Sequence, residues 1–200
     1  MSTNLSPREP ASARRLHLAV LFSDLSDSSQ LASRLEAEDY LDLLARVRDC
    51  CRLAVRRQQG LVVRLQGDGL LAVFGYPLGG EDTARRATEA ALELHAAVAR
   101  LGGTEGPHLP PLQMHSGIHA GLTLVIEGDC ERGRLDLLGE PPNIAARLCE
   151  QAEAGEIWVS QAALGPELYQ FEHRPVQRLQ LRGLAEPLPA VCITRRGRLL

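Results

Sequence analysis

The sequence predicts an α+β or α/β sandwich, in which helices cover the faces of a sheet. Short apolar runs alternate along the chain with longer stretches whose apolar residues recur every three or four positions. A Gly-Asp-Gly at residues 67–69 separates two apolar runs, which is a signal for a tight hairpin. At 200 residues the chain is long enough to bury a full core in one domain.

The first half of the chain predicts a strand, a helix, a hairpin and a second helix. The near-continuous apolar run at residues 16–22 indicates a central strand. Apolar residues on one face predict a helix over 28–57. The hairpin at 62–74 follows, and a second helix begins near Glu81 or Asp82 and ends at about Leu101.

The second half predicts shorter elements. A loop at 102–111, rich in Gly and Pro, precedes a region from 112 to 126 that predicts two strands, bent or turned between Gly117 and Gly121. The remaining predicted elements are a surface connection (127–134), a strand (135–138), a helix with two prolines in its first turn (141–152), a strand (156–159), a short helix (161–168) and two last strands (171–181 and 190–194).

Composition excludes several classes of protein. A net charge of −3 leaves no broad basic face for nucleic acid, and no apolar run approaches the ~20 residues of a membrane helix. The first 15 residues lack the apolar core of a signal peptide, and they and the basic residues 195–200 are expected to be disordered tails. The five cysteines show no disulfide or zinc spacing, which predicts a soluble protein of the reducing cytoplasm.

Two carboxylates stand at predicted strand ends. Asp24 follows the first apolar run, and Asp68 lies between the two glycines of the hairpin. Taken singly, Asp24 is more typical of a helix cap and Asp68 of an ordinary turn. As a pair they predict a site for hard divalent ions beside a phosphate. The turn that contains Ser28 and Ser29 and enters the first helix offers backbone N–H groups to that phosphate.

Two further patterns concern polar side chains. Asn143 and Arg147 are four residues apart on a predicted helix and therefore project from one face, where a guanidinium suits a phosphoryl transition state. His115 and His119 can share one side of a strand, but no third metal ligand accompanies them, so packing is the favoured interpretation.

Four segments together resemble the class III nucleotidyl cyclase catalytic domain. They are LFSDLSDSS, VVRLQGDGLLAVFGYP, SGIHAG and LDLLGEPPNIAARL, and the resemblance in order and spacing extends over about residues 16–194. It implies a fold similar to the ferredoxin-like palm, with a mixed, mainly antiparallel sheet flanked by helices. It also implies dimers whose active sites lie at the interface.

The resemblance assigns a role to each matching position. Asp24 and Asp68 match the metal-binding aspartates, with the Leu25 carbonyl as a further ligand. Asn143 matches the residue that positions the ribose, and Arg147 matches the one that stabilises charge on the α-phosphate. The positions implied to bind other parts of the substrate are Asp136 and Arg64 for the base and Arg182, before Gly183 on a late strand, for the triphosphate.

These assignments predict an adenylate cyclase that converts ATP to 3′,5′-cyclic AMP and pyrophosphate, with two Mg²⁺ or Mn²⁺ ions, in a head-to-tail homodimer. Arg64 stands where the family usually has Lys, so it could still contact adenine or could relax base choice towards guanine. Asp27 stands where many relatives have Gly, and it could cap the helix or weaken triphosphate binding. A guanylate cyclase and a nucleotide-binding, dimerising regulatory module without activity are therefore the alternatives.

Overall fold

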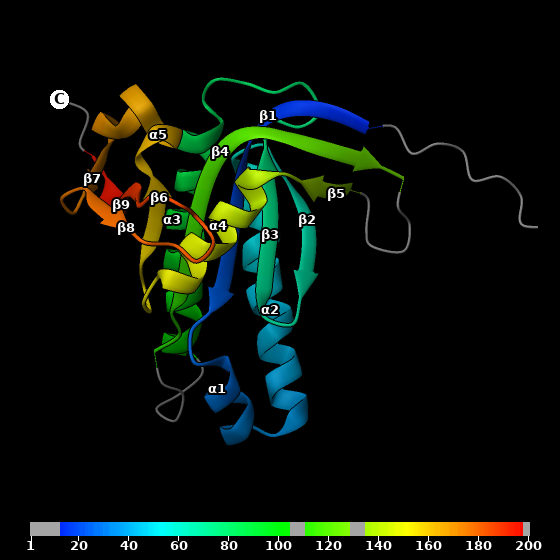
Figure 1. The fold of residues 1–200 in the computed structure, drawn as a ribbon. Helices are drawn as coiled ribbons and strands as arrows, with labels where there is room; N and C mark the ends of the chain where they lie inside the picture. Colours follow the sequence, from blue (N-terminus) through cyan, green and yellow to red (C-terminus); the bar gives the residue numbers. More distant parts are fainter. Residues whose placement is uncertain (1–12, 105–110, 129–134, 198–200) are drawn as a thin grey trace, which may run out of the picture.

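The computed structural model describes residues 13–104, 111–128 and 135–197 (Figure 1). These residues form a nine-stranded sheet with the order β2-β3-β1-β4-β6-β9-β7, in which β5 pairs with β4 and β8 with β9. The β4–β6 pair is parallel, and the other pairs are antiparallel. The strands are β1 (Ala13–Leu25), β2 (Gly60–Gln66), β3 (Gly69–Phe74), β4 (Met114–Glu127), β5 (Leu135–Leu138), β6 (Ile157–Ser160), β7 (Phe171–His173), β8 (Gln177–Leu179) and β9 (Leu188–Arg196). The predicted α+β class is confirmed.

Helices cover both faces of this sheet. They are α1 (Ser28–Arg34), α2 (Ala37–Arg57), α3 (Thr83–Thr104), α4 (Glu140–Gln151) and α5 (Gln161–Leu164), which is followed by a 3₁₀ turn (Gly165–Gln170). Figure 1 shows α2 and α3 behind the sheet and α4 in front of it. None of the helices in the described part of the chain is long and apolar enough to cross a membrane.

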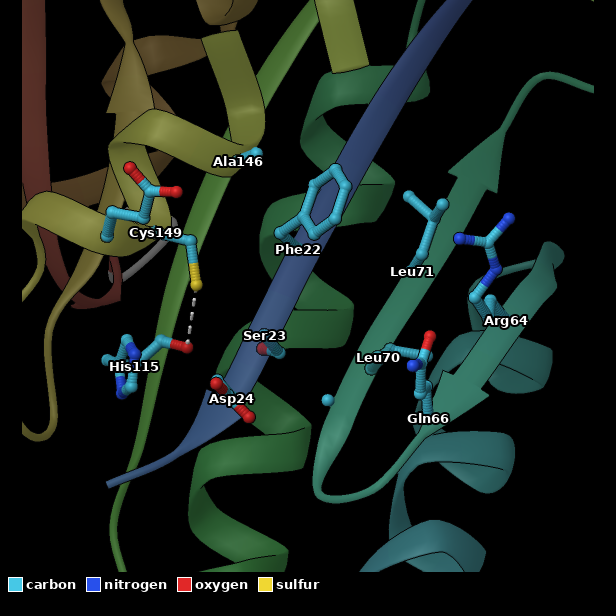
Figure 2. A pocket seen from close by; sticks show the side chains of 12 residues that line it. Phe22, Ser23, Asp24, Arg64, Gln66, Leu70, Leu71, His115, Ala146 and Cys149 are labelled. Atoms are coloured by element: carbon cyan, nitrogen blue, oxygen red, sulfur yellow. Dashed lines mark hydrogen bonds between the residues drawn. The ribbon is translucent and has the colours of Figure 1, made fainter. Parts of the chain in front are cut away.

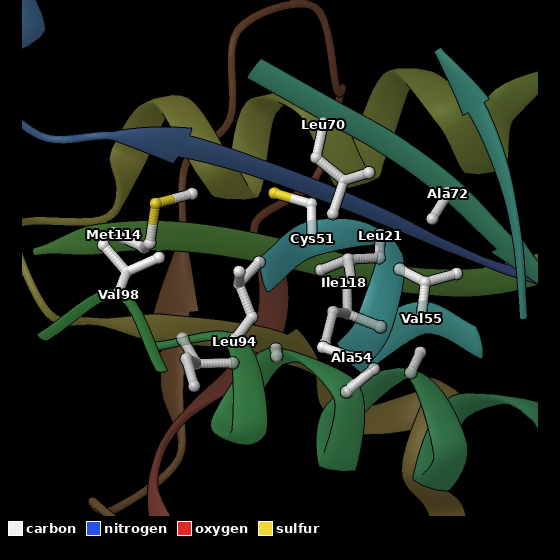
Figure 3. Close-up of a cluster of buried hydrophobic side chains, with 14 of the residues drawn as sticks. Leu21, Cys51, Ala54, Val55, Leu70, Ala72, Leu94, Val98, Met114 and Ile118 are labelled. Atoms are coloured by element: carbon white, nitrogen blue, oxygen red, sulfur yellow. The ribbon is translucent and has the colours of Figure 1, made fainter. Parts of the chain in front are cut away.

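The main core lies between the sheet and the pair α2–α3. Leu21 of β1 and Ile118 of β4 project from the sheet into this layer, where they meet Val55 of α2 and Leu94 of α3 (Figure 3). All four side chains are buried. The alternate residues Leu18 and Val20 of β1 face α4 instead, because successive side chains of a strand point to opposite faces.

The region from 112 to 126 is one strand rather than the two predicted. β4 pairs with β1 without interruption from Met114 to Ile126, so Gly117 and Gly121 make no turn. A β-carbon at Gly117 would lie 2.7 Å from the carbonyl carbon of Leu148, and closer still to the Ala145 oxygen and the Cys149 nitrogen. Gly117 is therefore required because the backbone of α4 lies directly on β4.

Other predicted boundaries change as well. The helix expected over 28–57 is broken at Leu35 and Glu36, whose backbones are extended, and no Gly or Pro marks the break. The strand expected over 171–181 is two short strands, β7 and β8. Residues 13–15 belong to β1, and Arg195 and Arg196 belong to β9, so the expected tails are shorter. Residues 1–12 and 198–200, and most of the connection at 127–134, lie outside the described residues.

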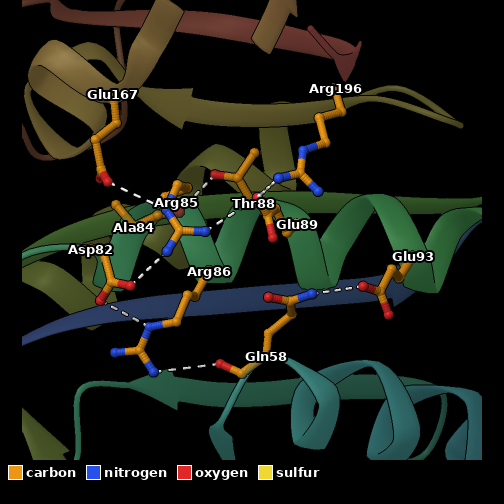
Figure 4. Close-up of polar contacts among 10 residues, drawn as sticks. All are labelled: Gln58, Asp82, Ala84, Arg85, Arg86, Thr88, Glu89, Glu93, Glu167 and Arg196. Atoms are coloured by element: carbon orange, nitrogen blue, oxygen red, sulfur yellow. Dashed lines mark hydrogen bonds and ion pairs between the residues drawn. The ribbon is translucent and has the colours of Figure 1, made fainter. Parts of the chain in front are cut away.

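A charged network joins α3 to its neighbours at the edge of this layer (Figure 4). Arg85 contacts Asp82 at 2.6 Å, Glu89 at 3.2 Å and Glu167 of the 3₁₀ turn at 3.4 Å. Arg196 of β9 contacts the same Glu89 at 3.4 Å. Glu89 is mostly buried and takes two guanidinium partners, which satisfies its charge inside the fold. The network therefore fixes α3 against β9.

Candidate active site

The structure brings the two predicted metal-binding carboxylates together. Asp24 lies near the end of β1, and Asp68 lies in the turn between β2 and β3. A β-carbon on Gly69 would stand 3.6 Å from the Oδ1 atom of Asp24, so the turn lies directly beside that carboxylate. Burial, and then the negative charge of Asp68, raise the pKa of Asp24 to about 6.

A helix residue that sequence reasoning missed holds this turn in place. Arg48 of α2 donates from Nε and Nη2 to the Gly67 carbonyl oxygen, at 3.1 and 2.8 Å. Gly67 has a φ of +61°, which glycine adopts readily and which the hairpin requires. Nothing in the sequence pattern separates Arg48 from the other arginines of α2.

A cavity of about 450 Å³ opens beside Asp24 (Figure 2). Asp24 lines one side, and Arg64 and Gln66, on the same face of β2, line the other. Sequence reasoning missed Gln66, although its spacing of two from Arg64 on a strand is a usable signal. The other lining residues are Phe22, Ser23, Gly69, Leu70, Leu71, His115, Ala146, Cys149 and Glu150.

The turn predicted to hold phosphates leads into α1, which has only seven residues. Asp27 precedes it with φ 57° and ψ 26°, in the left-handed region, and its side chain makes no capping hydrogen bond. Ser29 is exposed, and the side chain of Ser28 is hydrogen-bonded to Tyr40 of α2. The roles of Ser28 and Ser29 stay predictions.

Asn143 and Arg147 both lie on α4, as predicted. Asn143 is exposed, and its Nδ2 atom donates to the Gly139 carbonyl oxygen at 3.0 Å. The Arg147 guanidinium lies against Gly183, where a β-carbon would stand 3.1 Å from Nη2. Arg182 is in a turn between β8 and β9 and not on a strand, which corrects its predicted setting. This turn nevertheless lies beside Arg147.

Asp136 lies in β5, opposite Ile126 of β4. Its Oδ1 atom accepts a hydrogen bond from the Leu137 backbone N–H at 3.1 Å. Neither Asp136 nor the α4 residues Asn143 and Arg147 appear among the described residues that line the cavity beside Asp24. Within one chain, Arg64 therefore shares the cavity with Asp24, whereas Asp136, Asn143 and Arg147 lie outside its described lining.

The carboxylate pair fits hard divalent ions. Asp24 and Asp68 bring two negative charges close together at a half-buried edge, and each offers oxygen ligands. Among the residues that the structure describes, no group of three or more His, Cys, Asp or Glu side chains could hold a metal. Ions held here would therefore take their remaining ligands from backbone, water or substrate oxygens.

The two histidines of β4 are each hydrogen-bonded to a serine. His115 Nδ1 lies 3.0 Å from Ser26 Oγ, and His119 Nδ1 lies 2.6 Å from Ser160 Oγ. Burial lowers the pKa of His119 to about 4 and also lowers that of His115. Both rings are consequently neutral at physiological pH.

Residues 11–193 match the protein family described as "Adenylate and Guanylate cyclase catalytic domain". An uncharacterised protein of Mycobacterium tuberculosis (strain ATCC 25618 / H37Rv) is 36% identical over 139 residues, which cover 69% of this chain and 23% of that protein. An uncharacterised protein of Mycobacterium bovis (strain ATCC BAA-935 / AF2122/97) is 33% identical over 151 residues, with 74% and 27% covered. The chain thus spans about a quarter of the length of these curated relatives.

The fold is also similar to solved structures. The adenylyl cyclase CyaB from P. aeruginosa matches with a TM-score of 0.85 and 24% identity, over 94% of this chain and 99% of that chain. The guanylyl cyclase Cya2 matches with a TM-score of 0.84 and 23% identity, over 94% and 96%. At such identities the likeness concerns the fold alone, and it does not distinguish the two activities.

Proposed function

Because this chain belongs to the family of class III adenylate and guanylate cyclase catalytic domains, we propose that it converts ATP to 3′,5′-cyclic AMP and pyrophosphate. The observation that carries the proposal is the juxtaposition of Asp24 and Asp68 beside a cavity, in a chain that also keeps Asn143 and Arg147 on α4. In the reaction the ribose 3′-oxygen bonds to the α-phosphorus while the bond from that phosphorus to the β-phosphate oxygen breaks.

Members of this family generally use two divalent metal ions. In this chain the Asp24 and Asp68 carboxylates and the Leu25 carbonyl would hold Mg²⁺ or Mn²⁺. When bound, the ions would promote loss of the 3′-hydroxyl proton and neutralise charge on the attacking and leaving oxygens. The protein's own contribution there is to fix the two carboxylates, through the end of β1 and the turn that Arg48 holds.

The groups on α4 would act on the rest of the substrate. A guanidinium keeps its charge at every physiological pH, so Arg147 can stabilise the negative charge that develops on the α-phosphate oxygens. Asn143 is exposed and would orient the ribose, while Arg182 on the neighbouring turn would contact the triphosphate. Cyclase domains dimerise, so a head-to-tail homodimer would bring these groups of one copy to the carboxylates of the other.

Recognition of the base rests on two residues. The Asp136 carboxylate can accept a hydrogen bond from the 6-amino group of adenine, whereas the O6 acceptor of guanine would face it unfavourably. Arg64 can donate to the adenine N1 atom, but its fork can also donate to guanine oxygen and nitrogen acceptors. Asp136 therefore favours ATP, and Arg64 is the reason to test GTP.

The test is turnover by the purified protein with Mn²⁺, offered ATP and GTP separately, with products resolved by chromatography. We expect cyclic AMP from ATP and little product from GTP. Asp68→Asn should abolish turnover and leave the circular dichroism spectrum unchanged. Cyclic GMP as the main product would establish a guanylate cyclase, and a folded dimer without either product would favour a nucleotide-binding regulatory module.

A further inference from the structure

A hydrogen-bonded row of polar side chains, two buried serines and a partly buried histidine, lies behind the candidate metal site, between the sheet and α3. Ser23 of β1 and Ser116 of β4 are direct partners in the register, and their hydroxyl oxygens are hydrogen-bonded to each other. Ser116 Oγ also lies 2.8 Å from His95 Nε2, on α3. Ser23 is 2% exposed and Ser116 is 0% exposed, so neither can exchange its partner for bulk water.

The direction of these hydrogen bonds follows from the protonation state of the His95 imidazole ring. Burial lowers the pKa of His95 to about 4, so the ring is neutral and has one N–H donor and one acceptor. The backbone of Gly155 acts on the ring in the direction that favours a ring N–H donor, and the Gly155 N–H itself donates to the Met114 carbonyl oxygen. The ring therefore donates to the Gly155 carbonyl, and Nε2 accepts from Ser116.

The Ser116 hydroxyl proton is then committed to His95, so Ser116 must accept the proton of Ser23. Each hydroxyl proton then has one acceptor: Ser23 donates to Ser116, and Ser116 donates to His95. The His95 ring in turn donates to the Gly155 carbonyl. Burying three polar groups costs free energy that apolar residues of similar size would not require. A fully satisfied network in return specifies one arrangement of the strands that carry it.

What this network fixes is the end of β1. Ser23 immediately precedes Asp24, and the network pins Ser23 to β4 at that point. Asp24 in turn accepts a hydrogen bond from the Leu25 N–H at 3.1 Å, so its carboxylate orientation depends on the backbone of residues 23–25. These residues supply both the carboxylate and the carbonyl assigned to the metal.

We propose that His95, acting through Ser116 and Ser23, is a positioning residue for the metal-binding end of β1. This inference rests on the proposed function for the identity of the metal ligands. His95 touches neither carboxylate, so its replacement should loosen metal binding and leave the fold intact. Asp24 should reach its ligating position less often, and Mn²⁺ should bind more weakly by about threefold, less than the roughly tenfold or more expected for a group hydrogen-bonded directly to a metal ligand.

The experiment measures Mn²⁺ binding by electron paramagnetic resonance, without nucleotide, alongside the Mn²⁺ dependence of turnover and thermal unfolding. His95→Met removes the acceptor and fills the volume, Ser116→Ala removes the middle of the chain, and His95→Gln restores an acceptor. Thr88→Val is the matched control, because Thr88 is a buried α3 residue whose hydroxyl donates within its own helix, to the Ala84 oxygen at 2.8 Å.

We expect His95→Met and Ser116→Ala to weaken Mn²⁺ binding by similar factors. The double variant should show no further loss, because both substitutions interrupt the same hydrogen-bonded network. His95→Gln should recover most of the affinity, and Thr88→Val should keep all of it. Wild-type Mn²⁺ affinity in a folded His95→Met variant would overturn the inference, as would a loss equal to that of Thr88→Val.

The outcome is separable from that of the proposed function. Mn²⁺ binding that depends on His95, in a wild-type protein that makes no cyclic nucleotide, supports the positioning role and refutes the activity. Turnover with ATP and a Mn²⁺ affinity unaffected by His95→Met supports the activity and refutes the positioning role. A wild-type protein that binds no Mn²⁺ and makes no cyclic nucleotide refutes both.

Discussion

The guanidinium of Arg147 and the backbone of Gly183 are in direct contact. A β-carbon on Gly183 would stand 3.1 Å from Nη2 and 3.4 Å from Nη1, and Gly183 has a φ of +77°. The positive φ of the turn favours glycine at this position, and a β-carbon there would also press on the Arg147 guanidinium. The turn supports the side chain that we assign to the transition state.

Gly183→Ala is expected to displace the Arg147 guanidinium. Because a misplacement of about 1 Å can cost about a hundredfold in rate and the guanidinium has to move by less than that, kcat should fall by up to about tenfold. The KM for ATP should change much less. The measurement is steady-state turnover, with melting temperatures recorded in parallel.

Gly165→Ala is the control for backbone strain, because Gly165 also has a positive φ, of +49°, but no atom lies within 4 Å of its β-carbon position. The Gly165→Ala variant should lower the melting temperature about as much as Gly183→Ala does, and it should leave kcat unchanged. Equal losses of kcat in the two variants would mean that strain, and not the contact with Arg147, is responsible.

A shared site predicts complementation between two inactive chains. In a mixed dimer of Asp68→Asn and Arg147→Ala chains, one site contains both substitutions and the other contains neither. Half of the dimers in an equal mixture are mixed, and each has one of two sites intact, so the mixture should recover about a quarter of wild-type activity. The measurement is turnover after subunit exchange. Absence of activity in purified mixed dimers would contradict the shared site.

Asp27 occupies the left-handed region at the start of α1, with φ 57°. Asp27→Gly should relieve that backbone by about 0.5–1 kcal/mol and raise Tm by about 2 °C. It also removes a negative charge near the predicted phosphate turn, so the KM for ATP should fall about twofold to threefold. Kinetics and thermal unfolding check the two effects.

Two further variants separate charge from conformation at this position. Asp27→Asn removes the charge and keeps a residue that tolerates the left-handed region, so it should lower KM without raising Tm. Gln59 is the other described residue, besides glycines, with positive φ, at 54°, and Gln59→Gly should raise Tm without lowering KM. An unchanged KM in Asp27→Asn would exclude the electrostatic effect.

Stability should fall on acidification partly because of His95. Burial, and then the neighbouring His115, lower its pKa from 6.5 to about 4, so the unfolded chain binds the proton first. This contribution to the free energy of unfolding is complete above pH 6.5 and is lost as the pH falls towards 4, with a slope of up to about 1.4 kcal/mol per pH unit. Asp24 acts in the opposite sense: its pKa is raised from 3.8 to about 6, so the folded state binds the proton first and acidification through this range increases its contribution to stability.

The contribution of His95 is isolated by comparison with His95→Gln, which leaves Asp24 in place. Urea unfolding at pH 7.5 and at pH 5 should show a larger loss of stability for the wild type than for the variant. Parallel curves for the two proteins would contradict the assignment of a depressed pKa to His95.

The sequence made the Asp24–Asp68 pair predictable, because both residues end apolar runs and the hairpin signal is local. The continuous strand β4 was not predictable in the same way. Glycine is common in turns, which is why Gly117 suggested one. Here glycine is needed because α4, some thirty residues further along the chain, packs directly on the backbone of β4. Glycine can mean either a turn or a close packing contact, and local patterns do not distinguish them.

The network behind β1 also left no local signal. Ser23, Ser116 and His95 come from three separate elements, and a serine or histidine in an apolar segment matches no periodic template. Only the antiparallel register of β1 and β4 makes the two serines partners. The break at Leu35 and Glu36 likewise has extended backbone without any Gly or Pro, so nothing in the pattern of apolar residues ends the helix there.

The contact between Gly117 and α4 has a consequence for control of the enzyme. Gly117 packs backbone against backbone on α4, so α4 cannot slide over β4 at that point, and β4 pairs with β1 from Met114 to Ile126. Within one copy, the backbones that carry Arg147 and Asp24 are therefore held in place relative to each other. A signal that switches such a catalyst on or off would then act on the placement of one copy relative to the other.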